Sequence, residues 1–368
     1  MSTLLVVLLV ILPFCTDCIV FPRQDEGPLI AVMDFKGSKM DIFDPSGGVN
    51  ATVIEEINLE DGDRGACGIE FNYRGDVIYW TDLHAMKVYS LKADGIDQEQ
   101  KIIFEGDLGS PQGLAYDWIH NNLYVSDLGL NKIMVINPET GAWKTILYVH
   151  DVIDLEVDPT TGWLYWISGW EDTAVLMKST LDGQNQAVIS SDVERPMSLS
   201  LDYDEQRLYW TETYPVNMIK SIRVDGEDPK IVHQADSRYQ FSPMYITVTR
   251  DDIYWTQGST HRVLGRSKNT DQQPTRYKNL ETRGGRIILD KPFSGILAID
   301  PRKQTESPSL CGDYNGGCSH FCLPTLIQST PPYNCACPDG MNLMDDNSTC
   351  STEVTKNPKS NWLDSFFS

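Results

Sequence analysis

SLSLDYDEQRLYWTETYPVNMIKSIRVDG, residues 198 to 226, is the stretch of sequence that decides the fold. It begins with residues 198–202, which alternate apolar and polar side chains, and continues with the aromatic run 207–211. A second alternating run, 218–224, ends at an Asp-Gly turn, and the short run 230–233 follows it. Each run has the composition of a β-strand. Four strands of about five residues form a small twisted sheet, which needs copies of itself on either side to bury both faces.

The Tyr-Trp pair of this stretch, Tyr209-Trp210, recurs along the chain at a nearly fixed period. The equivalent pairs begin at Tyr79, Tyr124, Tyr165 and Tyr254, so that successive tyrosines are 45, 41, 44 and 45 residues apart. A period in this range, built of short strands, is typical of the blades of a β-propeller. Helical periodicity does not accompany the repeat, so the sequence predicts an all-β, repetitive architecture.

The ends of the repeat region predict how the propeller closes. The chain opens near Leu29 with three strands that lack a first strand, and residues 295–300 form a first strand without successors. Joining the two segments completes a composite blade and removes the exposed edges that an open array would present. First strands begin near Gly68, Gly113, Asp154, Ser198, Tyr245 and Gly295. We therefore predict a six-bladed propeller over residues 28–300.

The cysteines divide the rest of the chain. Of nine cysteines, two lie in the first 18 residues, Cys67 stands alone, and six lie between Cys311 and Cys350. Six cysteines in so short a stretch of an exported chain indicate a small domain that depends on its disulfides. We expect a linker at 301–310, this domain at 311–350 and a disordered tail at 351–368. Cys67 is expected to be a buried free thiol; the alternative is a reactive or intermolecular role.

The amino terminus indicates export. Residues 4–14 are an apolar run, too short to span a bilayer, and we interpret residues 1–18 as a signal peptide. The rest of the sequence has no apolar run long enough for a transmembrane anchor. We expect a secreted, soluble monomer that carries N-linked glycans at Asn50 and Asn347, each of which begins an Asn-X-Ser/Thr motif.

The net charge of −22 excludes a nucleic-acid partner, because little in the chain would neutralise phosphates. It is compatible with a basic partner, although a self-repelling secreted surface explains it equally well.

Propeller topology assigns the loops to two sides of the disc. The connections between blades and the turns between second and third strands fall on one side. That side carries large side chains that blade packing does not require: Trp170, Arg195, Tyr214, Arg238, Tyr239, Phe241 and Phe293. Aromatic side chains and arginines that converge on one face are typical of a binding surface. For any one of these residues, the alternative is that it only fills its own loop.

The motifs resemble a known family. The repeat is YWTD at residues 79–82, YVSD at 124–127, YWIS at 165–168, YWTE at 209–212 and YWTQ at 254–257. This repeat is similar to the YWTD repeat of the low-density-lipoprotein receptor class B family, and the stretch from Cys311 is similar to its EGF-like modules. The resemblance covers residues 28–350. It implies a six-bladed propeller followed by an EGF-like domain, with disulfides Cys311–Cys322, Cys318–Cys335 and Cys337–Cys350.

In that family, the acidic residue of the motif helps to tie blades together, and only Asp82 and Asp127 keep it unchanged here. Ser168 and Gln257 lack the charge, which implies weaker contacts in those blades. In the related Wnt co-receptor group, the loop side of the first propeller binds extended peptide segments of secreted proteins.

The leading functional hypothesis is therefore a secreted, non-catalytic module that binds an extracellular protein or peptide on the loop face. Ligands of the Wnt pathway and of lipoprotein receptors are among the candidate partners. One alternative is a matrix-docking protein, similar to nidogen in basement membrane. Another is a calcium-dependent propeller hydrolase, for which the first strands offer Glu70, Asp117, Glu156 and Asp202. We expect these four carboxylates to serve strand-end turns instead, and we expect no cofactor and no metal.

Overall fold

The computed structural model describes residues 27–34, 39–51, 53–59, 65–93, 99–213, 215–234, 242–258, 262–269, 275–277 and 293–351. The expected signal peptide, residues 1–18, and residues 352–368 of the expected tail lie outside these ranges.

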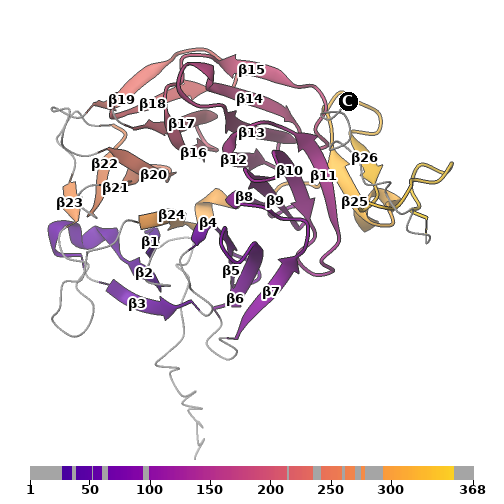
Figure 1. Ribbon diagram of the computed structural model, residues 1–368, viewed down its shortest axis with the longest axis horizontal. Helices are drawn as coiled ribbons and strands as arrows, with labels where there is room; N and C mark the ends of the chain where they lie inside the picture. Colours follow the sequence, from indigo (N-terminus) through magenta and orange to yellow (C-terminus); the bar gives the residue numbers. More distant parts are fainter. Residues whose placement is uncertain are drawn as a thin grey trace, which may run out of the picture.

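Six antiparallel sheets of four strands each are arranged around a central axis (Figure 1). The first complete blade comprises β4 (Ala66–Asn72), β5 (Val77–Asp82), β6 (Lys87–Lys92) and β7 (Gln100–Glu105). The second comprises β8 (Pro111–Asp117), β9 (Asn122–Asp127), β10 (Lys132–Ile136) and β11 (Trp143–Tyr148). The third comprises β12 (Val152–Asp158), β13 (Trp163–Ser168), β14 (Val175–Thr180) and β15 (Ala187–Ser190). The fourth comprises β16 (Pro196–Asp202), β17 (Arg207–Glu212), β18 (Met218–Arg223) and β19 (Lys230–Gln234), and the fifth comprises β20 (Pro243–Val248), β21 (Asp252–Gln257), β22 (Arg262–Ser267) and β23 (Thr275–Tyr277).

The sixth blade is composite, as the sequence predicts. Its strand order is β24-β1-β2-β3, with β24 (Phe293–Ile299), β1 (Leu29–Asp34), β2 (Lys39–Phe43) and β3 (Val53–Asn58). Leu29 pairs with Ile299 in an antiparallel register, so the two ends of the repeat region close the ring. The short 3-10 helix η1 (Pro45–Asn50) connects β2 to β3. The predicted six-bladed propeller is confirmed.

The motif tryptophans form the packing between blades. Trp80, Trp166, Trp210 and Trp255 are each at most 2% exposed. Trp80 stacks on Tyr89 of the same blade, with ring centroids 5.4 Å apart. Large flat side chains suit this position because the twisted faces of neighbouring blades leave a gap that small residues cannot fill.

The residues after β24 form a short connecting segment and the small disulfide-bonded domain. The 3-10 helix η3 (Pro301–Lys303) follows the closing strand, and η4 (Tyr314–Gly317) begins the small domain. Its two strands, β25 (Phe321–Pro324) and β26 (Tyr333–Ala336), pair in an antiparallel hairpin. The disulfides are Cys311–Cys322, Cys318–Cys335 and Cys337–Cys350, the pairing that the resemblance implies.

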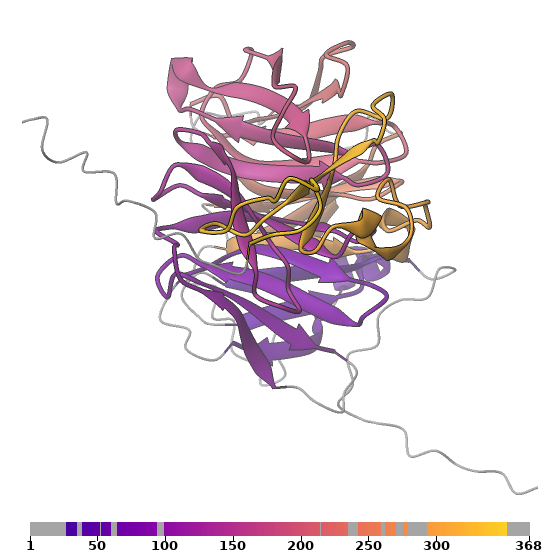
Figure 2. The same cartoon turned by 90° about the vertical axis from the view of Figure 1, so that its right-hand side faces the viewer.

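The EGF-like module packs against the rim of the second and third blades, beside β11 (Figures 1 and 2). Phe321 and Leu323 are buried in a cluster with Leu147 and Leu181 of the propeller. The backbone N–H of Asp339 donates to the Trp143 carbonyl at 3.0 Å, and the Thr145 N–H donates to the Asp339 carboxylate at 3.1 Å. The module therefore covers the free edge of β11 with hydrogen-bonding groups as well as with apolar surface.

We expect Phe321→Ala to lower the free energy of unfolding by about 3 kcal/mol, because it removes a 2%-exposed ring from this interface. Chemical denaturation followed by circular dichroism measures the change. Tyr314→Ala in the same module is the matched control, since Tyr314 is 95% exposed. Equal stabilities of the two variants would contradict the packing described above.

Candidate functional site: the loop face of the propeller

The loop face consists of the connections between blades together with the turns between second and third strands. A backbone hydrogen bond joins the two kinds of loop in each of five blades. These bonds run from Leu83 N–H to Gly65 (2.9 Å), from Leu128 to Ser110 (3.0 Å), from Gly169 to Asp151 (3.0 Å), from Thr213 to Arg195 (3.0 Å) and from Gly258 to Ser242 (3.1 Å). The predicted assignment of these loops to one side of the disc is therefore confirmed.

The acidic residue of the motif holds the loops of the loop face in place through hydrogen bonds to their backbone. The buried Asp127 carboxylate accepts N–H groups from Gly109 and Ser110, both at 2.8 Å, and from Leu130 at 3.1 Å. Asp82 accepts from the turn that follows it, at His84 and Ala85. Backbone N–H groups that are removed from water need another hydrogen-bond acceptor, and the buried carboxylate provides it. These hydrogen bonds make both loops rigid.

Trp170 and Arg195 lie on the loop face as expected. Trp170 is 41% exposed and precedes the 3-10 helix η2 (Glu171–Thr173). The Thr173 hydroxyl donates to the Trp170 carbonyl at 2.7 Å and accepts its N–H at 3.2 Å, which fixes the backbone that displays the indole. Arg195 is half-buried and pairs with the Glu171 carboxylate at 2.5 Å. Tyr214, Arg238, Tyr239 and Phe241 lie outside the described residues.

Phe293 is not on the loop face. Strand β24 begins at Phe293 instead of at Gly295, so the phenyl ring enters a buried cluster with Tyr254, Val263 and Ile296. Its exposed fraction is 8%. The ring packs between blades, and the expectation that it contributes to a binding surface is wrong.

Three exposed apolar residues on the loop face were missed in the sequence. Met86 and Leu130 occupy the same turn as Trp170 in the two preceding blades and are 45% and 40% exposed. Tyr148, the last residue of β11 before the connection to the third blade, is 82% exposed. For Met86 and Leu130, the sequence signal is their place a few residues after the tyrosine motif of their blade. With Trp170, these side chains form an apolar arc over three consecutive blades.

Acidic groups dominate the charge beside the arc. The basic side chains are paired: Lys87 with Glu105 at 3.4 Å, Lys132 with Asp107 at 2.6 Å, and Lys220 with Asp192 at 3.0 Å. Asp151, Asp172 and Glu194 are exposed, and no lysine or arginine in the described part of the chain forms an ion pair with them. Among the residues that the structure describes, the loop face therefore carries a surplus of negative charge.

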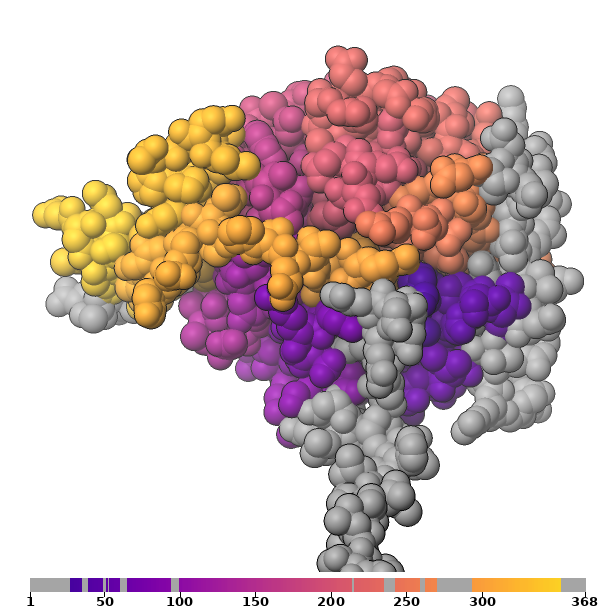
Figure 3. All heavy atoms as spheres, turned by 180° about the vertical axis from the view of Figure 1, so that it is seen from behind, coloured from indigo at the N-terminus to yellow at the C-terminus, as the bar shows by residue number. Residues whose placement is uncertain are grey.

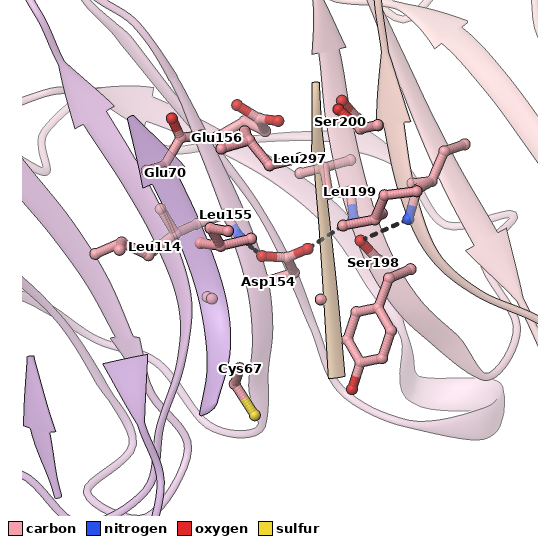
Figure 4. Close-up of a pocket in the computed structure, with 18 of the residues that line it drawn as sticks. Cys67, Glu70, Leu114, Asp154, Leu155, Glu156, Ser198, Leu199, Ser200 and Leu297 are labelled. Atoms are coloured by element: carbon pink, nitrogen blue, oxygen red, sulfur yellow. Dashed lines mark hydrogen bonds between the residues drawn. The ribbon is translucent and has the colours of Figure 1, made fainter. Parts of the chain in front are cut away.

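A cavity of about 70 Å³ lies in the central channel, lined by the first strands (Figure 4). Asp117 and Asp202 cap turns as expected, each accepting two backbone N–H groups of its own turn. Glu70 and Glu156 do not, because they lie in mid-strand and line the cavity with Asp154. The expectation that all four carboxylates serve turns is wrong for these two.

Burial raises the pKa of each channel acid. The pKa is about 6 for Asp154, about 7 for Glu70 and about 8 for Glu156, and desolvation is the main cause in all three. The Asp154 carboxylate joins two blades, since it accepts the N–H of Leu155 and that of Leu199 in the next blade, both at 2.9 Å. Cys67 is a buried free thiol, as predicted, with a pKa raised to about 12 by burial. Within the described residues, no three His, Cys, Asp or Glu side chains are grouped to hold a metal ion.

Asn347 is exposed in a turn of the EGF-like module and has a left-handed backbone, with φ of 54°. We expect Asn347→Gln to remove one glycan when the chain is made in a eukaryotic secretory host, because an exposed turn admits the oligosaccharide. Intact mass before and after enzymatic deglycosylation measures the loss. An unchanged mass would show that this motif is not used. Asn50 ends η1, and its side chain lies outside the described part of the structure.

Comparisons with known proteins agree with this architecture. Residues 76–118 match the low-density lipoprotein receptor repeat class B, and residues 311–350 match the family described as the coagulation factor Xa inhibitory site. The chain is 28% identical over 282 residues to the vitellogenin receptor Yl of Drosophila melanogaster, covering 76% of this chain and 13% of that protein. It is 30% identical over 314 residues to low-density lipoprotein receptor-related protein 5 of Mus musculus, covering 83% of this chain and 18% of that protein. The chain thus spans less than a fifth of each of these relatives.

Among solved structures, a chain of a nidogen/laminin complex superposes with a TM-score of 0.61. The match covers 74% of this chain and 98% of that one at 18% identity, which shows a shared fold. Within the ranges that the structure describes, no helix has the length and apolar character needed to cross a membrane.

Proposed function

Because the chain carries a low-density lipoprotein receptor class B propeller joined to an EGF-like module, we propose that it is a non-catalytic, secreted binding protein. Its ligand is an extracellular protein or peptide, held on the loop face by a monomeric propeller. The observation that carries the proposal is the apolar arc of Met86, Leu130, Tyr148 and Trp170, which is exposed beside loops that side-chain hydrogen bonds of Asp82, Asp127 and Thr173 hold in place. Rigid, exposed aromatic and aliphatic side chains are the usual anchors of protein interfaces.

The charge beside the arc defines the partner further. Exposed Asp151, Asp172 and Glu194 favour a ligand whose apolar anchor is flanked by lysine or arginine. Such charges act mainly on the association rate, so binding should weaken as salt is added. The relatives named above are receptors, and their likeness supports binding as the role of this propeller.

Affinity capture from native extracellular fluid tests the proposal. The bait is the mature chain, and the test variant is Leu130→Ser with Trp170→Ala. We expect this variant to lose the captured protein by about tenfold or more, because each substitution removes an anchor of the arc. The control is Ile231→Ser on β19 at the rim, where Ile231 is 62% exposed and lies away from the loop face. A ligand retained equally by all three baits would contradict the proposed site.

A further inference from the structure

The segment that follows the closing strand lies across the face opposite the loop face. This strap, residues 300–306, crosses the back of the disc on its way to the EGF-like module (Figure 3). The Gln304 side chain donates to the Phe71 carbonyl at 2.6 Å and accepts the Tyr73 N–H at 2.9 Å. The Trp118 indole N–H donates to the Thr305 carbonyl at 3.0 Å. The strap is therefore attached to the first and second complete blades by hydrogen bonds that do not depend on pH.

Of the strap residues, only Lys303 lines the central cavity, together with Glu70 of β4 and Glu156 of β12. Its ammonium nitrogen lies 5.9 Å from the centroid of the Tyr203 ring, at the turn end of the channel. Glu70 and Glu156, the glutamate pair, each accept one backbone N–H at 3.2 Å, from Phe71 and Leu201. A cation from the strap thus shares one small cavity with two buried carboxyl groups.

We propose that Lys303 and the glutamate pair form a proton-controlled latch that sets how firmly the strap closes the channel. When the carboxyl groups are ionised, they attract the ammonium group across the cavity. When they take up protons, this attraction is lost, and the strap is held by its neutral hydrogen bonds and by two ion pairs, Arg302–Asp251 at 3.4 Å and Arg74–Glu306 at 3.5 Å. The proposal needs no ligand, so its outcome is separate from that of the proposed function.

The pKa values place the change near neutral pH. Burial raises the pKa of Glu70 to about 7 and that of Glu156 to about 8, and Lys303 opposes the rise in both. Acidification from pH 8.5 to pH 6 therefore protonates the pair and weakens the hold on Lys303. The stability of the whole fold changes in the opposite direction. Folding raises the pKa of these carboxyl groups, so the folded chain becomes less stable as pH rises through that pKa.

Other titratable groups face the pair from the surrounding elements. They are Cys67 from β4, Asp154 from β12, Tyr245 from β20 and Tyr203 after β16, with Asp117 and Asp158 near Tyr203. Lys303 also lines a second pocket, whose charged residues are Asp202, Asp204, Arg250, Asp300 and Arg302. The lining residues from β8 and β24, such as Leu114 and Leu297, carry no charge. The pKa of Asp154 is about 6, and burial raises the pKa values of Cys67 and Tyr245. The glutamate pair therefore accounts for most of the change in charge within the cavity between pH 6 and pH 8.5.

Hydrogen exchange of the strap tests the latch. The Lys303 and Gln304 amides donate to the Asp300 and Pro301 carbonyls and report on strap opening. After correction for intrinsic exchange, we expect their protection in the wild-type chain to fall about fivefold between pH 8.5 and pH 6. In Glu70→Gln/Glu156→Gln and in Lys303→Met, protection should be low at both pH values. The Gly226 amide, bonded to the Arg223 carbonyl in a rim turn, is the internal control.

Thermal melting measures the stability of the whole fold, whose pH dependence is opposite to that of strap protection. Glu156→Gln should melt above the wild-type chain at pH 8.5, and the difference should shrink at pH 6, because glutamine cannot acquire the buried charge. Wild-type strap protection that is equal at both pH values would overturn the latch. A Lys303→Met chain that keeps the wild-type pH dependence would overturn it as well.

Discussion

Replacing Trp210 with alanine is expected to lower the free energy of unfolding by about 4 kcal/mol. Trp210 is 2% exposed and packs in a cluster that joins the third and fourth blades, with Leu176 and Leu199 among its members. Its indole N–H also donates to the buried Glu212 carboxylate at 2.9 Å. The substitution therefore leaves a large cavity and removes a hydrogen bond from a buried anion.

Chemical denaturation followed by far-ultraviolet circular dichroism measures this change without relying on tryptophan fluorescence. Trp170→Ala is the matched control, since the same side chain is removed from a 41%-exposed position on the loop face. We expect the control to lose less than about 1 kcal/mol. If both variants lost the same stability, the motif tryptophans would not be the packing element between blades.

Asp127→Ala is expected to cost about 3 kcal/mol, because three backbone N–H groups lose a charged acceptor inside the protein. Two of those groups belong to the connection between blades, at Gly109 and Ser110, and the third belongs to the turn at Leu130. The substitution should also loosen the loop face locally, so that the amides of Gly109 and Ser110 exchange faster. Denaturation and hydrogen exchange measure the two effects.

The matched control is Ser168→Ala, at the equivalent motif position of the next blade, where no charge is present to lose. We expect it to cost less than about 1 kcal/mol. A loss as large as that of Asp127→Ala would contradict the role assigned to the motif carboxylate.

The repeat made the fold predictable from sequence alone. Tyrosine motifs at a nearly constant spacing reveal the blades, and the unmatched strands at Leu29 and Gly295 reveal the closure. These features depend on local composition and on counting, which a single sequence contains in full. The start of β24 was placed two residues late because Phe293-Ser294 has no strand alternation of its own, and this error assigned Phe293 to the wrong environment.

The site was less predictable because it depends on which side of a strand or loop a side chain occupies. Glu70 and Glu156 were assigned to turns from their nearness to strand ends, whereas the pleat directs them into the channel. Met86, Leu130 and Tyr148 look ordinary in sequence and become a group only when consecutive blades place them on one face. Trp170 and Arg195 could be found because topology alone puts their loops on that face.

Hydrogen-exchange footprinting of the chain bound to its captured ligand tests the central claim most directly. If the loop face is the binding surface, bound ligand will slow exchange in residues 83–86, 128–131, 148–151 and 169–174. The turns of the opposite face, at residues 73–76 and 118–121, will exchange as in the free chain. Protection confined to those turns or to the EGF-like module, with the loop face unchanged, would contradict the account.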